Sequence, residues 1–343
     1  MIINKNSKFA LVGHGYHLFA LYESFIQQNL TKPIIITHSK HLHKRDIRES
    51  KNNKKLYRDI TELEKKTSVF YVKNFSLKIV GSLLKKYNIK YIFSCSSRFI
   101  FKKDIIDLYK NKIFNIHPTL LPMEKGGGTF TYRILNKNFF CCATIHLIDE
   151  GIDTGKILMQ SKKKPLSNKS LPIDFLISKN KIYENLIKNF VKKISKEKKF
   201  VLKKQDFKNG TYLSRFYTDL MGAINWNWSG ENINLFIQGC SIPYSGAFCF
   251  IYYKGRKFKI KIFRSKFIKS HNKYHEWFIG KIFYEDEKKI KVIVNNGYLN
   301  IDKKHIILPY KTNIKFEGKT FFNETSNLNK SLTHIPNVFK YTQ

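Results

Sequence analysis

The amino-acid sequence predicts an α/β domain built on a mostly parallel sheet, followed by a small antiparallel, β-barrel-like C-terminal domain. In the first half, short apolar runs alternate with segments of helical periodicity. In the second half, apolar and polar residues alternate along short runs that turn signals separate. The 343 residues are enough for two domains. With 42% apolar residues, packed structure is favoured over disorder.

The first half contains four short apolar runs that read as strands, at residues 9–12, 33–37, 91–94 and 113–116, and a further strand is expected at 143–148. Between them, residues 18–28 and 77–87 have apolar positions at three- and four-residue spacing, which predicts amphipathic helices. Ligands of such folds bind at the carboxyl ends of the strands. This rule directs attention to the residues from Ser94 and from Asn115 onward.

The second half begins after a predicted lysine-rich helix at residues 173–194. A polar and basic stretch, 195–212, is expected to link two domains, one of residues 1–203 and one of residues 204–343. Beyond it, four alternating runs predict antiparallel strands at 247–253, 257–263, 277–284 and 289–294, with turn signals at Lys254-Gly255 and Asn296-Gly297.

The charge and the cysteines restrict the class of protein. The net charge of +38 would attract phosphates or nucleic acid, but the lysines are spread over the whole chain, which favours a compositional bias. The five cysteines lack zinc-site spacing, so no metal is expected. With no signal-peptide pattern and no apolar run of membrane-spanning length, a cytoplasmic protein without membrane contact is expected. The five histidines between His14 and His43 are expected at the surface.

The residues that carry chemistry lie in Asn115-Ile-His117-Pro-Thr-Leu-Leu-Pro122 and in Asp149-Glu-Gly-Ile-Asp153-Thr-Gly155. Asn115 and His117 lie two apart at a strand end, so their side chains leave the same face. The flanking glycines allow Asp153 to turn back toward His117. An amide donor for an oxyanion and a base held by a carboxylate suit acyl transfer to an amine. Gly126, Gly127 and Gly128 are interpreted as flexible backbone that lines the acceptor site.

With these motifs in order, the sequence resembles the folate-dependent formyltransferase family, which includes methionyl-tRNA formyltransferase and the nucleotide-sugar N-formyltransferases. The resemblance implies a Rossmann-like catalytic domain, N10-formyltetrahydrofolate as formyl donor, and Asn115, His117 and Asp153 as catalytic residues. It also implies folate contacts in two loops, at Ser94, Arg98, Phe99, Ile100, Asp149, Gly151, Ile152 and Thr154. The runs Ile224-Asn225-Trp226 and Pro243 to Phe248 are similar to the start of the family's β domain.

Short motifs within this family resemblance indicate which acceptor the protein uses. The loop Val12-Gly-His-Gly-Tyr-His17 and the run Met123 to Gly128 depart from the tRNA enzymes, whereas residues 126–132 and 243–248 look more like the sugar enzymes. A nucleotide-linked amino deoxysugar is therefore the favoured acceptor. Initiator methionyl-tRNA is the alternative, and a catalytically silent nucleic-acid-binding protein is a second one. A homodimer is possible.

Overall fold

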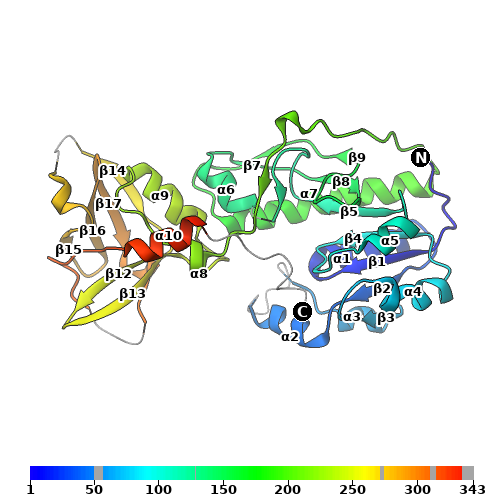
Figure 1. Cartoon of the computed structure of the whole chain (residues 1–343), viewed down its shortest axis with the longest axis horizontal. Helices are drawn as coiled ribbons and strands as arrows, with labels where there is room; N and C mark the ends of the chain where they lie inside the picture. Colours follow the sequence, from blue (N-terminus) through cyan, green and yellow to red (C-terminus); the bar gives the residue numbers. More distant parts are fainter. Residues whose placement is uncertain (50–56, 128, 271–273, 310–313, 334–343) are drawn as a thin grey trace.

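The structure is a computed structural model that describes residues 1–49, 57–127, 129–270, 274–309 and 314–333 (Figure 1). Its first part is built on a seven-stranded sheet in the order β3-β2-β1-β4-β5-β8-β9. The strands are β1 (Phe9–Gly13), β2 (Ile34–Thr37), β3 (Val69–Tyr71), β4 (Tyr91–Cys95), β5 (Ile113–His117), β8 (Thr144–Leu147) and β9 (Ile157–Gln160). The first five run parallel, and β8 and β9 are antiparallel to their neighbours. This confirms the predicted α/β, Rossmann-like class.

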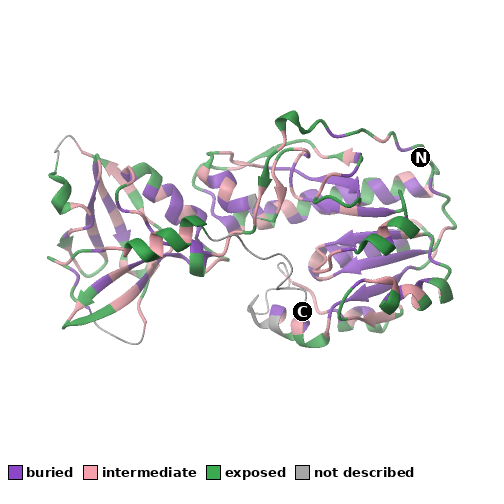
Figure 2. Ribbon diagram, viewed as in Figure 1, coloured by how far each residue is buried: buried purple, intermediate pink, exposed green. Residues whose placement is uncertain are grey.

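Helices cover both faces of this sheet. One face packs against α1 (Gly15–Gln27) and α7 (Pro172–Ser195), through residues such as Leu11 and Phe114. The other face packs against α4 (Leu77–Lys86) and α5 (Lys103–Leu108), through residues such as Val12 and Ile92. Figure 2 shows the strands as the most deeply buried part. Neighbouring residues such as Leu11 and Val12 thus pack against opposite helix layers, as expected for strands buried on both faces.

The remaining elements of the first part are short. They are α2 (Lys40–Glu49), α3 (Thr61–Glu64), α6 (Thr129–Leu135), β6 (Lys125–Gly126), β7 (Phe140–Cys141) and β10 (Lys164–Pro165). β7 pairs with β10, and β6 pairs with β11 (Tyr212–Leu213). The stretch at 195–212 that the sequence suggests as a linker therefore lies against the first part, where Lys203 also forms a β-bridge with Ile157.

The second part is an antiparallel β structure with its own core. One sheet contains β12 (Ala247–Tyr253), β13 (Arg256–Ile262) and β18 (Ile306–Ile307), and the other contains β14 (Lys266–Lys269), β17 (Gly297–Asp302), β16 (Lys289–Val294) and β15 (Ile282–Glu285). In the described residues the two sheets do not close into a barrel. Two single bridges, Phe250 with Phe322 and Lys281 with Thr320, connect them along one side.

One predicted strand of the second part begins later than expected. The run 277–284 starts with a 3-10 turn at Glu276–Phe278, and the strand begins only at Ile282. The ring of His275 accepts the N–H of Trp277, and Gly280 has a φ of 86°. A capped turn and a left-handed glycine both interrupt extended backbone, so the alternating pattern alone gave the wrong start.

The two parts meet where α6 packs against α9 (Gly230–Gly239), while α8 (Thr218–Met221) and α10 (Thr325–Thr333) lie together on the second part (Figure 1). The hydroxyl of Thr131 donates to the carbonyl oxygen of Gly239 at 2.9 Å. The Gln238 amide donates to the carbonyl oxygens of Asn168 and Ser170, each at 2.9 Å. Among the described helices, none has the length and apolar character needed to cross a membrane.

Candidate active site

The two polar residues at the end of β5 stand at the carboxyl edge of the parallel strands. Asn115 is half-buried, and His117 is 5% exposed. Because they are two residues apart in extended backbone, their side chains leave the same face of the strand. On the neighbouring strand, Ser94 pairs in register with Asn115. This edge is where open α/β sheets bind their ligands.

A turn after β8 brings a carboxylate to His117. Asp153 has a φ of 55°, and its Oδ2 lies 3.3 Å from Nδ1 of His117. The same oxygen accepts the N–H of Gly126 at 2.9 Å. The Gln205 amide donates to the carbonyl oxygens of Asp153 and Gly155 at 2.9 and 2.7 Å. Gln205 belongs to the stretch expected to be a linker, so this stretch holds the turn that carries Asp153.

A histidine that sequence reasoning missed completes the group. His146 is 1% exposed and stands directly opposite Asn115 in the β5–β8 pair. Its Nε2 lies 3.2 Å from the Asn115 amide nitrogen and 3.5 Å from Oδ1 of Asp153, and its Nδ1 lies 2.8 Å from the carbonyl oxygen of Leu147. Nδ1 is within hydrogen-bonding distance of the Leu147 carbonyl oxygen, and Nε2 lies beside both the Asn115 amide and the Asp153 carboxylate, so the ring connects these two residues. The signal was present, because Thr144 and His146 alternate with apolar residues in β8.

Burial opposes charge on both members of the His117–Asp153 pair. It lowers the pKa of His117, while the Asp153 carboxylate and the Glu124 carbonyl act against that shift. Burial alone would raise the pKa of Asp153, but His117, His146 and the N–H of Gly126 outweigh it and hold that pKa below its usual range. Asp153 is therefore ionised at neutral pH and can hold the His117 ring in one orientation.

The loop between β5 and α6 closes over His117. Nε2 of His117 lies 3.0 Å from the carbonyl oxygen of Glu124, whose carboxylate accepts from Nε of Arg133 at 2.6 Å. Arg133 is 1% exposed and also donates to the carbonyl oxygen of Phe140 at 2.8 Å. A guanidinium this deeply buried requires such acceptors. A substrate atom can reach Nε2 of His117 only when the Glu124 carbonyl moves aside. Sequence reasoning missed this pair, since a Glu and an Arg in a loop and a helix carry no special spacing.

The residues that the resemblance assigns to folate fall in two loops. The loop after β4 carries Ser94, Arg98, Phe99 and Ile100, and the loop after β8 carries Asp149, Gly151, Ile152 and Thr154. Lys103 and Glu150 form an ion pair between the first turn of α5 and the second loop, so the two loops are neighbours.

The side chains of these two loops are not all turned toward each other. The Arg98 guanidinium donates to Oδ1 of Asp46 in α2 at 2.6 Å. In the second loop, the Asp149 carboxylate accepts from the Gly151 N–H at 3.2 Å and from the Thr154 hydroxyl at 2.5 Å. Ile152, by contrast, is 49% exposed. The second loop is thus a self-bonded turn that presents an apolar side chain.

The glycine run expected to line the acceptor site has a backbone role in this structure. Gly126 has a φ of 93°, and a Cβ there would lie 2.4 Å from the carbonyl oxygen of Leu213 in β11. The Gly126 N–H is bonded to Asp153, and the Gly127 N–H donates to Leu213 at 3.1 Å. These N–H groups are engaged within the protein. Gly128 lies outside the described residues.

The expectation of surface histidines was wrong for three of the five. His17, His38 and His43 are 5%, 3% and 2% exposed, while His41 is exposed. The turns after β1 and β2 fold together under α2, and the His38 and His43 rings stack at 4.0 Å. This burial comes from tertiary packing, which local sequence does not display. Across the described ranges, no group of three His, Cys, Asp or Glu side chains is placed to hold a metal ion.

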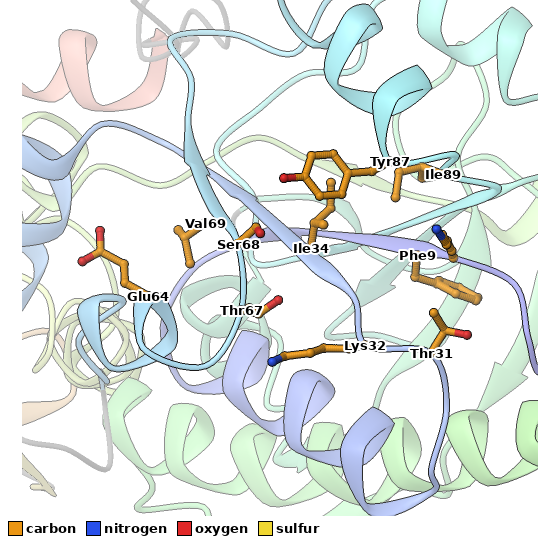
Figure 3. Close-up of a pocket in the computed structure, with 11 residues that line it drawn as sticks. Phe9, Thr31, Lys32, Ile34, Glu64, Thr67, Ser68, Val69, Tyr87 and Ile89 are labelled. Atoms are coloured by element: carbon orange, nitrogen blue, oxygen red, sulfur yellow. The ribbon is translucent and has the colours of Figure 1, made fainter.

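A cavity of about 700 Å³ lies at the opposite edge of the sheet (Figure 3). Its lining includes Phe9, Ile34 and Val69, which are the first residues of β1, β2 and β3. The cavity is therefore separated from Asn115 and His117 by the length of the strands and does not belong to the same site.

The arrangement at the carboxyl edge defines a class of protein. An amide donor, an imidazole and an ionised carboxylate converge beside neighbouring loops at the end of a Rossmann-like sheet. The amide can stabilise an oxyanion, and the imidazole can move a proton. These are the requirements of an acyl-transfer enzyme.

Comparison with known proteins narrows this class. Residues 5–171 match the formyl transferase family, and residues 218–323 match the formyl transferase C-terminal domain. The chain is 28% identical to methionyl-tRNA formyltransferase of Finegoldia magna over 67% of this chain and 71% of that protein. It is 30% identical to methionyl-tRNA formyltransferase of Borrelia turicatae over 64% of this chain and 68% of that protein.

A solved structure shares the fold over most of the chain. It is the N-formyltransferase from Helicobacter canadensis, described in complex with folinic acid and dTDP-3-aminofucose, with a TM-score of 0.63 and 20% identity over 86% of this chain and 98% of that chain. At this identity the likeness shows the fold. Together with the sequence matches, it establishes that the chain belongs to the formyl transferase family and is a formyltransferase.

Proposed function

We propose that this protein transfers the formyl group of N10-formyltetrahydrofolate to the primary amine of a nucleotide-linked amino deoxysugar. The observation that carries the proposal is the convergence of Asn115, His117 and Asp153 at the carboxyl edge of the sheet. The fold shared with an enzyme described in complex with folinic acid and dTDP-3-aminofucose supports the choice of donor and acceptor.

The folate donor supplies the formyl carbon when it is bound. The two loops beside Asn115 suit a flat heteroaromatic ring, since they present the exposed Ile152 and the half-buried Phe99 and Ile100 next to backbone groups of residues 149–154. Arg98 would contribute through its backbone, because its guanidinium is bonded to Asp46.

Each residue of the site has a distinct task in this reaction. The Asn115 amide donates to the formyl oxygen as negative charge develops there, a contribution of about 10²- to 10³-fold for one donor. Asp153 remains ionised and orients Nδ1 of His117, so Nε2 is the nitrogen that moves the proton. As the new C–N bond forms, His117 takes the proton that the amine loses, and it returns a proton to the folate nitrogen as the old C–N bond breaks. The products are a formamide and tetrahydrofolate.

A second acceptor is favoured by a separate observation. Sequence relatives that are methionyl-tRNA formyltransferases match about two thirds of this chain, and the net charge of +38 suits a nucleic-acid substrate. Initiator methionyl-tRNA is therefore the second candidate. The sugar is preferred because of the glycine run at 126–128 and the Pro243 to Phe248 run.

The test is an acceptor panel. Tetrahydrofolate release is followed spectrophotometrically with dTDP- and UDP-linked amino sugars and, separately, with initiator methionyl-tRNA. Release that depends on a sugar nucleotide, with the formamide product seen by mass spectrometry, is the expected result. Release with the tRNA alone would move the protein to translation initiation. Absence of release with every amine would overturn the proposal.

A further inference from the structure

A lysine on α7 lies close to the proposed site, and none of the described carboxylates pairs with it. Lys179 is half-buried, with its ammonium 5.3 Å from the ring centre of Tyr183 and 6.0 Å from that of Phe130 in α6. In the part of the chain that the structure describes, no carboxylate forms an ion pair with Lys179. The charged or ionisable groups that bear on it are the buried thiols of Cys95 and Cys141.

The neighbours of Lys179 connect it to the catalytic strand. Tyr183, one turn further along α7, donates its hydroxyl to the carbonyl oxygen of Ile116 at 3.3 Å. Ile116 stands between Asn115 and His117. The ring of His17, in the first turn of α1, lies 4.5 Å from the Tyr183 ring, and its Nδ1 is 3.1 Å from the hydroxyl of Ser96 after β4. Lys179 thus faces the junction of β1, β4 and β5, at the same edge as the catalytic residues.

Burial disfavours the charged forms of both Lys179 and His17 at this junction. Burial lowers the pKa of Lys179 to about 8, and burial also lowers the pKa of His17, with Lys179 as the next cause. A half-buried ammonium without a counter-charge is costly. An anion that entered the junction would relieve that cost and would draw the lysine back to its charged form.

We propose that Lys179 binds an anionic group of the acceptor, namely a phosphate of the nucleoside diphosphate that carries the amino sugar. This inference rests on the proposed function. Among charged groups of such an acceptor, only the phosphates offer a full negative charge to an ammonium. The polar groups beside it, Ser96 and the ring of His17, can add hydrogen bonds, and the α1 N-terminus that carries His17 favours negative charge.

The proposal predicts proton uptake on binding. An anion next to Lys179 raises its pKa, so at pH 8 a fraction of the lysines takes up a proton when the ligand binds. Calorimetry in two buffers of different ionisation enthalpy measures this uptake. The probes are dTDP, UDP and inorganic pyrophosphate, without any formyl donor, so binding is read independently of turnover.

Three variants make the test specific. Lys179→Met should weaken binding of these probes about 10- to 100-fold, whereas Lys179→Arg should retain binding but lose the proton uptake at pH 8, since arginine does not titrate there. Lys181→Met is the matched control, because Lys181 is exposed on the same helix, two residues away, and should bind like the wild type. Thermal melting checks that each variant is folded.

Equal binding of the probes by the wild type and Lys179→Met would overturn the proposal. Selective loss of initiator tRNA binding in Lys179→Met, with no nucleoside diphosphate bound by the wild type, would overturn the assignment to a sugar nucleotide. Turnover distinguishes a failure of the anion site from a failure of the proposed function. Probe binding that depends on Lys179, without formyl transfer to any amine, supports the anion site and refutes the proposed function.

Discussion

At the scale of the residue, the two ring nitrogens of His117 both face oxygen acceptors. Nδ1 faces the Asp153 carboxylate, and Nε2 faces the Glu124 carbonyl. Only a protonated ring can donate to both, yet burial lowers the pKa of His117. The neutral ring leaves one contact unsatisfied, so displacement of the Glu124 carbonyl by a substrate atom costs little at neutral pH. This gives the loop at 119–127 a physical reason to open for substrate.

His146 is expected to position Asn115. His146→Met removes the ring that contacts the Asn115 amide and should lower kcat up to about 10²-fold, because a misplaced donor no longer meets the developing charge. The KM for the formyl donor should change little. Steady-state kinetics measure both, and His41→Gln, at an exposed histidine of α2, is the control. A His146→Met enzyme with wild-type kcat would show that the contact is only structural packing.

The Glu124–Arg133 pair is expected to stabilise the fold around the site. Glu124→Gln leaves the Arg133 guanidinium, 1% exposed, without its carboxylate and should cost about 3 kcal/mol of the free energy of unfolding. Urea unfolding measures the loss. Glu231→Gln removes an exposed partner of Lys137 and should cost less than about 1 kcal/mol. Equal effects of the two substitutions would contradict the assigned burial.

At the scale of the element, the sequence predicted β1, β2, β4, β5 and β8 of the central sheet but not β3 and β9, and it predicted the small elements poorly. The sequence shows apolar runs at β1, β2, β4 and β5, because parallel strands are buried on both faces. The 3-10 turn before β15 depends on a single capping contact, that of His275 with Trp277. The pairing of β6 with β11 depends on a partner far away in the sequence. The local periodicity of apolar residues predicts neither the turn nor the pairing.

The same limit applies to the site. Motif order predicted Asn115, His117 and Asp153, and the turn at Asp153 follows from its glycine neighbours. His146, Gln205 and Arg133 contribute through partners 31, 52 and 9 residues away, to Asn115, Asp153 and Glu124 respectively. A sequence distance of this kind becomes a contact only after the sheet and its loops have been assembled.

Two histidines, His14 after β1 and His43 in α2, make stability depend on pH. Burial lowers the pKa of His14 well below 6.5 and that of His43 to about 4. Because the folded-state pKa values lie below the unfolded value of about 6.5, the unfolded chain binds more protons between them. Stability is therefore complete above about pH 6.5 and falls as the pH decreases toward 4.

Urea unfolding at pH 7.5, 6 and 5 tests this expectation. The free energy of unfolding should fall by roughly 1.4 kcal/mol per pH unit for each fully shifted histidine. His43→Gln should flatten the dependence, whereas His41→Gln should leave it unchanged. A free energy that stays constant between pH 7.5 and 5 would mean that these rings are charged or open to solvent in the folded protein.

At the scale of the whole molecule, the net charge of +38 is distributed over both parts. Such a protein attracts RNA without sequence preference, and this attraction depends steeply on salt because counterions are released from the phosphates. Initiator tRNA and an unrelated RNA of the same length should bind alike and lose affinity together between about 0.05 and 0.3 M salt. This range includes the ionic strength of about 0.1 M at which the Debye length is about 10 Å. Filter binding measures the slopes. A preference for initiator tRNA that persists at high salt would favour the tRNA as acceptor.

In this reaction we expect His117 to move the proton during formyl transfer to an amine. The most direct test compares the wild type, His117→Ala and the exposed-site control His41→Ala for tetrahydrofolate release with the amine acceptor identified in the panel. We expect that His117→Ala, shown to be folded by thermal melting, loses about 10²- to 10⁴-fold in kcat, whereas His41→Ala keeps the wild-type kcat. Wild-type turnover by a folded His117→Ala protein would show that His117 does not move the proton and that another group does.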